Sequence, residues 1–355
     1  MGRSFLKPVS LAAAWLLAAV LLAGCGDKAT SAAHTEAPGG LEVTELRYQG
    51  SVGAVTFPEL AEDLGYLAPL KLKFIGTTIS GPQDIQAVVT GDTDFGGAFN
   101  GAIVKLIAAK APITPVISYY GVDDNTWSGY YVLDDSPIQS AKDLIGKKIA
   151  VNTLGAHHEF VIKEYLRREG LTEAENEQVT LVVVPPVTGE QTLRASQVDV
   201  ATLGGVLRDK ALERGGIRPL FTDKDLFGVF SAGSYVLTNK FIQDNPQATR
   251  KFVEATAKAI EWARTTPPDE VRARYTKIIK ERGRKEDDSS IKYWKSTGVA
   301  GTGGLIAPEE FETWVNWLVQ DGTIGEGEVD GSRIYTNEFN PYRDGGELAD
   351  DNGKN

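Results

Sequence analysis

Short apolar runs alternate with amphipathic helical stretches along most of the chain after residue 40. The clearest case lies between residues 140 and 170, where an apolar run at 148–151 precedes a polar turn at 152–155 and a helical stretch that ends at Gly170. Its apolar residues recur with the 3.6-residue period of one helix face: Val161, Ile162, Tyr165 and Leu166. This order predicts a β-α unit whose helix begins next to the end of its strand.

The same alternation predicts the elements of a larger α/β fold. We expect strands at 41–48, 71–75, 113–120, 148–151, 179–184, 198–203, 217–221 and 231–238. We expect helices at 57–67, 83–90, 100–110, 156–169, 189–196, 205–214, 246–265, 268–280 and 308–321. The Gly-rich residues 91–97 are expected to form a turn. Strands that alternate with helices favour doubly wound, mostly parallel sheets, here followed by C-terminal helices.

The first 25 residues have the pattern of an export signal. Arg3 and Lys7 precede an apolar run at 11–22 that is too short for a comfortable membrane span. Cys25 ends the sequence Leu-Ala-Gly-Cys, which resembles the bacterial lipobox. We therefore predict a lipoprotein signal peptide at 1–24, lipidation of Cys25, and a flexible tether at 25–40.

Composition and charge narrow the class of protein. The chain has 355 residues, 42% of them apolar, which is long enough for two domains. A formal net charge of −11 argues against nucleic-acid binding. The sequence has no nucleophile elbow, phosphate-binding loop or His-Glu-x-x-His helix, and its single cysteine excludes an intramolecular disulfide. We therefore expect no cofactor and no enzyme of these classes.

Three motifs carry a resemblance to a known family. Residues 142–151 read Lys-Asp-Leu-x-Gly-Lys-Lys-Ile-Ala-Val, residues 58–67 end in Gly-Tyr-Leu, and residues 91–96 read Gly-x-x-Asp-Phe-Gly. With these motifs the chain resembles the sulfonate-, nitrate- and taurine-binding (SsuA/THI5-like) family of ABC-transporter solute-binding proteins, over about residues 41–342. The resemblance implies the type II periplasmic-binding-protein fold, in which two α/β lobes enclose a ligand.

The resemblance also implies boundaries and partners. Lobe 1 would comprise residues 41–129 and 237–345, lobe 2 would comprise residues 130–236, and residues 346–355 would be a disordered acidic tail. Such a protein captures one small solute, here a sulfonate, nitrate or taurine-like anion, as its lobes close, and then docks on permease subunits. We expect an extracytoplasmic monomer that meets the membrane only through its lipid anchor.

Six loops are expected to line the ligand cleft, because open α/β sheets bind ligands at the carboxyl ends of their strands. These loops are rich in small and hydroxyl-bearing residues and precede helices, whose free N–H groups can hold an anion. The candidate ligand-binding residues are Ser51, Val52, Thr77, Thr78, Ser80, Phe99, Asn100, Leu154, Gly155, Ala156, His157, Thr188, Gly189, Glu190, Gly204 and Gly205. The loops contain no Arg or Lys, which is equally compatible with a neutral ligand.

Several side chains in these loops leave alternatives open. His157 and His158 are adjacent on a helix, so their rings point about 100° apart, and we expect no metal site. His158 continues the inward stripe, which favours packing, whereas His157 is the better candidate for a ligand contact as a neutral imidazole. If Glu190 faces the cleft, it would favour an amine or a ring N–H. The aromatic residues at 119–131 either line the cleft or, as we prefer, pack at the hinge.

Three alternatives accompany this interpretation. The solute could be a pyrimidine or another thiamine-precursor heterocycle, since pyrimidine-binding relatives share the fold. A pyrimidine-precursor synthase on the same fold would need a cysteine-rich motif, and Cys25 is the only cysteine. A sensor or adhesion module without a transporter is the third alternative.

Overall fold

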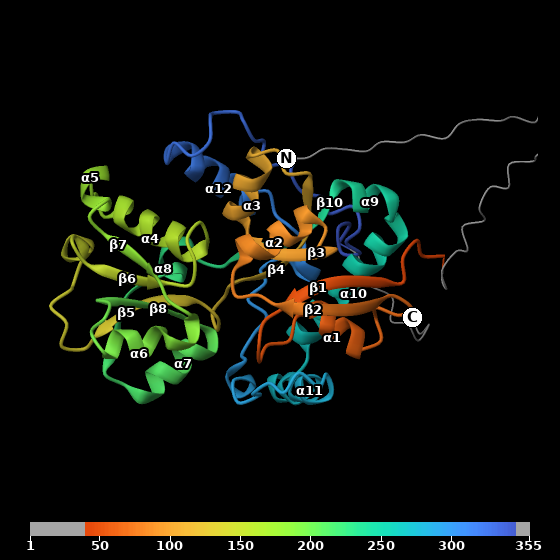
Figure 1. The fold of residues 1–355 in the computed structure, drawn as a ribbon, viewed down its shortest axis with the longest axis horizontal. Helices are drawn as coiled ribbons and strands as arrows, with labels where there is room; N and C mark the ends of the chain where they lie inside the picture. The colour runs from red at the N-terminus through yellow and green to blue at the C-terminus, as the bar shows by residue number, and fades with distance from the viewer. Residues whose placement is uncertain (1–39, 346–355) are drawn as a thin grey trace, which may run out of the picture. The chain divides into compact units, whose positions relative to one another are not determined.

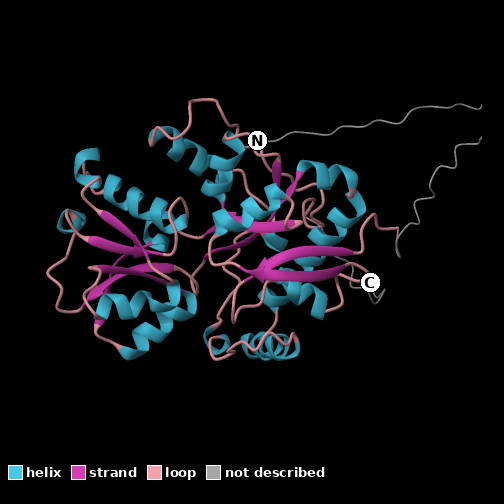
Figure 2. Cartoon of the chain, viewed as in Figure 1, coloured by secondary structure: helices cyan, strands magenta, loops and turns pink. Residues whose placement is uncertain are grey.

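The structure of the protein is a computed structural model that describes residues 40–345. The predicted signal peptide, Cys25, nearly all of the tether and the acidic tail lie outside the described residues. Within 40–345, no helix is both long enough and apolar enough to cross a membrane. Apart from the direct step from β4 to β5, strands and helices alternate up to β10, and helices follow it, which confirms the α/β class with C-terminal helices (Figure 1 and Figure 2).

The early strands and the last strand of the chain share two sheets (Figure 1). Strand β1 (Glu45–Gly50) pairs in parallel with β2 (Lys71–Thr77). Strand β10 (Phe230–Thr238) lies between β3 (Phe95–Phe99) and β4 (Ile113–Val122) and is antiparallel to both. The chain therefore returns to this three-stranded sheet after it has built the middle of the fold.

The middle of the chain forms a five-stranded sheet in the order β7-β6-β8-β5-β9. Its strands are β5 (Ser128–Leu133), β6 (Lys148–Val151), β7 (Thr180–Val183), β8 (Val200–Gly204) and β9 (Ile217–Thr222). Tyr130 and Val132 of β5 face a core with α4 (His157–Arg168), whereas Tyr131 faces a second core with α6 (Gly189–Arg194) and α7 (Gly205–Arg214). Helices thus cover both faces of this sheet (Figure 1).

The other helices pack around the two smaller sheets or connect strands. They are α1 (Phe57–Asp63), α2 (Gly81–Thr90), α3 (Asn100–Ala108), α5 (Glu173–Asn176), α8 (Asp223–Phe227), α9 (Asn239–Asp244), α10 (Pro246–Thr265), α11 (Pro268–Glu281) and α12 (Glu309–Gln320). Tyr235 and Leu237 of β10 join a core with α1, α10 and α11. Ala232 and Val236, on the other face of β10, join a core with α2, α3 and α12. The side-chain alternation of one strand therefore connects two cores.

Strand direction is more mixed than the expected mostly parallel sheets. Among the strands of residues 40–345, only the pairs β1-β2, β6-β7 and β6-β8 are parallel. Strands β3 and β4 run in the same direction, as the helix between them requires, but β10 is inserted antiparallel between them. Strand β5 is inserted in the same way between β8 and β9, which α7 connects. In each case the inserted strand arrives from the other sheet, so it does not share the direction of its neighbours.

The turn that we predicted at residues 91–97 is wrong in its second part, because residues 95–97 belong to strand β3. Its glycines do not bend the chain; they let neighbours approach the strand closely. A Cβ on Gly96 would lie 2.8 Å from the carbonyl oxygen of Asp84, and one on Gly97 would lie 2.6 Å from the ring of Tyr119. Glycine in a strand often marks such a close approach, which a pattern based on composition reads as a loop.

Candidate functional site

A cavity of 330 Å³ lies between the three-stranded sheet and the five-stranded sheet. Residues at the carboxyl ends of strands, at helix starts and in the connection from β4 to β5 line it. They are Gly81, Ala98, Phe99, Tyr119, Tyr120, Gly121, Thr126, Trp127, Ser128, Asn152, Ala156, His157, His158, Gly204, Gly205, Asp223 and Thr297. Its volume suits a small solute rather than a polymer.

Besides α8, which the hydroxyl of Thr222 caps, four helices begin at this cavity. Gly81 is the first residue of α2, Phe99 precedes α3, Ala156 precedes α4, and Gly204 precedes α7. No side chain caps any of these four N-termini, whereas the hydroxyl of Thr56 caps α1. The first N–H groups of a helix have no partner within the helix, and each N-terminus carries roughly half a positive charge. The cavity therefore concentrates backbone donors and positive potential.

The acidic and basic side chains that line the cavity are the carboxyl group of Asp223 and the imidazoles of His157 and His158. Asp223 is 0% exposed, and its Oδ1 accepts a hydrogen bond of 2.9 Å from the backbone N–H of Ser128. Its Oδ2 lies 3.1 Å from Nε2 of His157, the first residue of α4. None of the described residues that line the cavity is a Lys or an Arg. The positive potential there comes from helix ends, with His157 beside the buried acid.

His158 differs from its neighbour. Burial, with a smaller effect from His157, lowers the pKa of His158 to about 3, so its imidazole is neutral at physiological pH. It lines both the main cavity and an adjoining cavity of 170 Å³ that Thr202 and Gly189 also line. Nδ1 of His158 and the hydroxyl of Thr202 are buried without a hydrogen-bond partner among the described residues. We expected His158 only to pack against the sheet, but its ring also lines two cavities.

Aromatic rings form one wall of the cavity. Tyr119 stacks on Tyr235 at 4.0 Å between ring centroids and contacts Tyr120 at 4.9 Å. Burial raises the pKa of both Tyr119 and Tyr120, so both phenols keep their protons. The guanidinium of Arg208 lies 3.7 Å from the ring centroid of Trp127. We preferred a packing role at the hinge for these aromatic residues. Tyr119, Tyr120 and Trp127 also line the cavity, so packing is not their only role.

Part of the predicted set of ligand-binding residues meets at this cavity. Phe99, Ala156, His157, Gly204 and Gly205 line it, and Gly189 lines the adjoining smaller one. The other predicted residues do not line either cavity: Ser51, Val52, Thr77, Thr78, Ser80, Asn100, Leu154, Gly155, Thr188 and Glu190. The residues that reach the cavities lie at helix starts, but Ser80, Asn100 and Thr188 also lie at helix starts and do not reach them.

Two loops from this second group meet at the rim of the cavity. The hydroxyl of Ser80 lies 3.4 Å from that of Thr153, and Nδ2 of Asn152 donates to the carbonyl of Ile79 at 3.4 Å. Leu154 is 51% exposed, and Val52, on another loop, is 64% exposed. These loops bridge the two sheets, and Asn152 also lines the cavity.

Two predicted polar residues are held by partners elsewhere. Asn100 is fully buried, accepts a hydrogen bond of 2.8 Å from Ser234 and donates to the backbone carbonyl of Glu310. Arg214 and Arg194 bind the carboxylate of Glu190 and lower its pKa. Neither side chain is free for a ligand, and the acid at the cavity is Asp223 instead.

Asp223, Thr126, Ser128 and Thr297 were not among the predicted residues. The stretch Thr222-Asp-Lys-Asp225 has the pattern of a helix start, and the hydroxyl of Thr222 does accept from the N–H of Asp225. That signal indicates α8 but not its position beside α4. Thr297 comes from a segment far along the chain, which no local pattern connects to the cavity.

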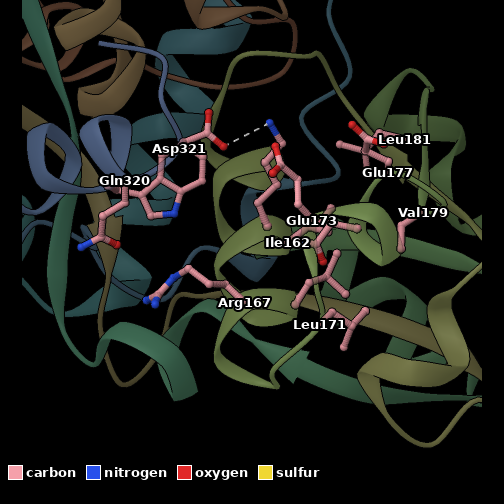
Figure 3. A pocket seen from close by; sticks show the side chains of 13 residues that line it. Ile162, Arg167, Leu171, Glu173, Glu177, Val179, Leu181, Gln320 and Asp321 are labelled. Atoms are coloured by element: carbon pink, nitrogen blue, oxygen red, sulfur yellow. Dashed lines mark ion pairs between the residues drawn. The ribbon is translucent and has the colours of Figure 1, made fainter. Parts of the chain in front are cut away.

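The described residues contain no group of three or more His, Cys, Asp or Glu side chains placed to hold a metal ion. A larger cavity, of 610 Å³, lies between α4, α5 and α12 (Figure 3). The C-terminal halves of α4 and α12 contribute to its lining, and Nζ of Lys163 lies 3.9 Å from Oδ1 of Asp321. Size alone favours this cavity, but the smaller one collects four helix starts and a buried acid.

The matched family model is described as NMT1/THI5 like and covers residues 60–270. The chain belongs to this family. A relative from Brucella abortus, named as a binding protein, is 25% identical over 206 residues, 57% of this chain and 61% of its own length. The 4-amino-5-hydroxymethyl-2-methylpyrimidine phosphate synthase of Candida albicans is 27% identical over 227 residues, 59% of this chain and 63% of its own length. Each match thus spans less than two thirds of the relative.

Solved structures agree on the fold. The periplasmic aliphatic sulphonate binding protein SsuA from Escherichia coli superposes with a TM-score of 0.61 at 18% identity, over 83% of this chain and 92% of that one. The periplasmic nitrate-binding protein NrtA from Synechocystis superposes with a TM-score of 0.63 at 13% identity, over 84% and 88%. The predicted family and the periplasmic-binding-protein fold are confirmed.

Proposed function

We propose that the protein is the extracytoplasmic solute-binding component of an ABC importer and that its solute binds in the 330 Å³ cavity. The observation that supports this most is the meeting of four uncapped helix N-termini, those of α2, α3, α4 and α7, at one cavity between two sheets. Such an arrangement binds a small molecule from both sides, as a closing two-lobe protein requires.

The solute that fits these helix starts best is a small anion of the sulfonate, nitrate or taurine type. Several partial charges and free N–H groups can replace the hydration of an anionic group without a formal cation. Asp223 opposes an anion, but its Oδ1 accepts a hydrogen bond from the backbone N–H of Ser128 and its Oδ2 lies 3.1 Å from Nε2 of His157. The proposed ligand contacts are Phe99, Ala156, His157, Gly204 and Gly205, with Tyr119, Tyr120 and Trp127.

A heterocycle of the pyrimidine type is the second candidate solute. The rings of Tyr119, Tyr120 and Trp127 offer flat apolar surface, and the carboxylate of Asp223 suits an amino group or a ring N–H. The name of the Candida albicans relative concerns a substituted aminopyrimidine, which motivates including that class in the test.

We propose binding without catalysis. A synthase on this fold was expected to need a cysteine-rich motif, and the only cysteine, Cys25, lies outside the described residues. The two lobes would be those predicted from the sequence, with one adjustment. Because β10 starts at Phe230 and pairs with β3 and β4, the second crossing between lobes would lie at about residues 228–229.

The remaining parts of the proposal concern location and partners. Residues 1–24 would direct export, Cys25 would carry the lipid, and the tether would keep a monomeric binding protein near its permease. These parts depend on the amino-terminal sequence and on the family, and they can fail independently of the cavity.

Thermal unfolding of the purified protein with taurine, methanesulfonate, nitrate or 4-amino-5-hydroxymethyl-2-methylpyrimidine tests the solute proposal. A solute at 100 times its Kd stabilises the folded state by about 2.7 kcal/mol, a readily measured rise in the unfolding temperature. We expect at least one anion to give this rise. Mass spectrometry of small molecules released on denaturation extends the search. If no compound raises the unfolding temperature and no solute is released, the proposal is wrong.

A further inference from the structure

Helix α4 contributes to two separate hydrophobic cores. Val161, Ile162 and Leu166 pack in the core of the five-stranded sheet. Phe160 lies closer to the start of the helix than these three residues. It packs instead in the core of α3, α12 and β10 and is 2% exposed. One side chain of the second lobe is therefore buried in the core of the first.

Phe160 is held in an aromatic socket. Its ring centroid lies 4.4 Å from that of Trp317, 5.0 Å from that of Phe99 and 6.0 Å from that of Trp314. Gly101 of α3 leaves the space that the ring occupies, since a Cβ there would lie 2.9 Å from Cε1 of Phe160. Contacts of this kind are dry and closely packed, and they separate only when the whole ring leaves its socket.

The contacts between the lobes at the rim of the solute cavity are of a different kind. The hydroxyls of Ser80 and Thr153 and the Asn152–Ile79 hydrogen bond are long, at 3.4 Å each, and the Asn152 bond is exposed. Long, water-accessible hydrogen bonds contribute little, because water replaces either partner at once.

A third set of contacts joins the segment 289–297 to α7. Nζ of Lys295 lies 2.8 Å from Oδ2 of Asp209, and the hydroxyl of Tyr293 donates to Glu213 at 2.8 Å. The Lys295 side chain is 46% exposed, and the Tyr293 bond is exposed as well. The Asp209 side chain is only 10% exposed, but it keeps its pairing with Arg208 when the exposed Lys295 ammonium leaves, and an exposed hydrogen bond such as that of Tyr293 exchanges readily with solvent.

We infer that Phe160 is a pivot: the second lobe tilts about its socket, so that the rim and the 289–297 contacts break while α4 stays docked on α3 and α12. The ranking of the three sets of contacts carries the inference, because the two polar sets, each of which includes an exposed hydrogen bond or an exposed ion-pair partner, separate before the buried aromatic one. The role of this motion in solute entry rests on the proposed function, but the motion itself does not depend on a solute.

The pivot makes a geometric prediction. His157, before Phe160 on α4, lines the solute cavity, whereas Lys163, Leu166 and Arg167, after it, line the 610 Å³ cavity beside α12 (Figure 3). A rigid helix that tilts about Phe160 moves its two ends in opposite directions relative to α12. The 610 Å³ cavity therefore narrows when the rim of the solute cavity opens, and it widens when the rim closes.

Two pairs of spin labels measure these movements in the solute-free protein. Cys25→Ser removes the only native cysteine. Ile79→Cys with Leu154→Cys, at residues that are 59% and 51% exposed, spans the rim. Glu177→Cys with Gln320→Cys spans the 610 Å³ cavity (Figure 3). We expect distance distributions with a longer component for the 79–154 pair and a matching shorter component for the 177–320 pair.

Variants of the socket complete the test. Phe160→Ala should broaden the 177–320 distance distribution, and the 177–320 distance should no longer shorten as the 79–154 distance lengthens. Phe160→Leu should keep part of this inverse relation. Val161→Ala, one residue away but in the other core, is the matched control and should change neither distribution. Circular dichroism checks that each variant folds. If Phe160→Ala does not fold, the relation between the two distances in the otherwise native chain decides.

Two results would overturn the inference. Both distances could lengthen together, which would mean that α4 leaves α12 as the rim opens. Alternatively, the rim pair could show a single narrow distance, which would mean that the lobes do not open there. Either result is independent of solute binding, so a failed pivot and a failed solute proposal are distinguishable.

Discussion

The carboxyl group of Glu310 lies buried at the start of α12, where it accepts a hydrogen bond of 2.6 Å from Ser118. Burial raises the pKa of Glu310 from 4.5 to about 7 and that of Asp84 from 3.8 to about 7. Because each folded-state pKa lies above the unfolded-state value, the protonated form is favoured by folding. Its stabilising contribution is complete below the unfolded-state pKa and is lost as the pH rises through about 7.

Glu310→Gln tests this at a single residue. The amide cannot ionise, but its oxygen can still accept from Ser118, so the variant should lose less stability than the wild type between pH 4.5 and pH 7.5. The difference in the free energy of unfolding across this range should be on the order of 3 kcal/mol. Urea unfolding at both pH values measures it. Glu309→Gln, at an exposed neighbour, is the control, and an equal loss in all three proteins would contradict the prediction.

At the scale of elements, the hydrophobic pattern predicted most helices and strands, because each buries one face or one stripe. The helices of residues 205–214 and 246–265 and the strand of residues 148–151 have the predicted bounds. Strand β3 was missed because its glycines serve the close approach of Tyr119 and Asp84, and the short helices α5, α8 and α9 are too short to show a period. The pattern also showed where helices begin but not that four of them begin at one cavity.

Ala156→Ser tests whether the start of α4 holds the solute. A hydroxyl at this position would cap the first N–H groups of the helix and raise the free energy of unfolding of the solute-free protein by about 1 kcal/mol. If the same N–H groups bind the solute, the variant should bind it more weakly even though it is more stable. Thermal unfolding with and without the stabilising solute measures both effects.

Pro267→Ser is the matched control for this variant. Pro267 precedes α11, also lacks a side-chain cap, and does not line the solute cavity. A new cap there should change stability without changing affinity. An Ala156→Ser protein that keeps full affinity would show that the solute does not depend on the N-terminus of α4.

At the scale of the molecule, the two sheets are joined by the exchange of strands β5 and β10. Arg208 of α7 secures one of the two connections, from β4 to β5. It is 1% exposed, donates to the carbonyls of Trp127 and Asn125 at 3.0 and 3.3 Å, and pairs with Asp209 at 2.8 Å. The guanidinium of Arg208 thus holds the β4–β5 connection against α7 through two hydrogen bonds.

Arg208→Lys should loosen this connection although it keeps the charge. A lysine ammonium cannot reach both carbonyls and stack on Trp127 at once, so we expect a loss of about 2 kcal/mol in the free energy of unfolding. Arg333→Lys, at a side chain that is 84% exposed, should have no measurable effect. Chemical denaturation compares the two, and equal stability of both variants would refute the role of Arg208.

The sequence by itself determined the α/β class, most of the elements, the family and a set of helix starts suited to an anion. These follow from local periodicity and short motifs, which need no knowledge of what packs against what. Only the tertiary structure decided which helix starts meet, because Phe99 and Gly204 are far apart in the chain and converge through strand insertion. It also decided that Asp223 rather than Glu190 is the acid at the cavity, since nearby arginines hold Glu190. Long-range packing sets the environment of a charged side chain, and a local pattern does not contain it.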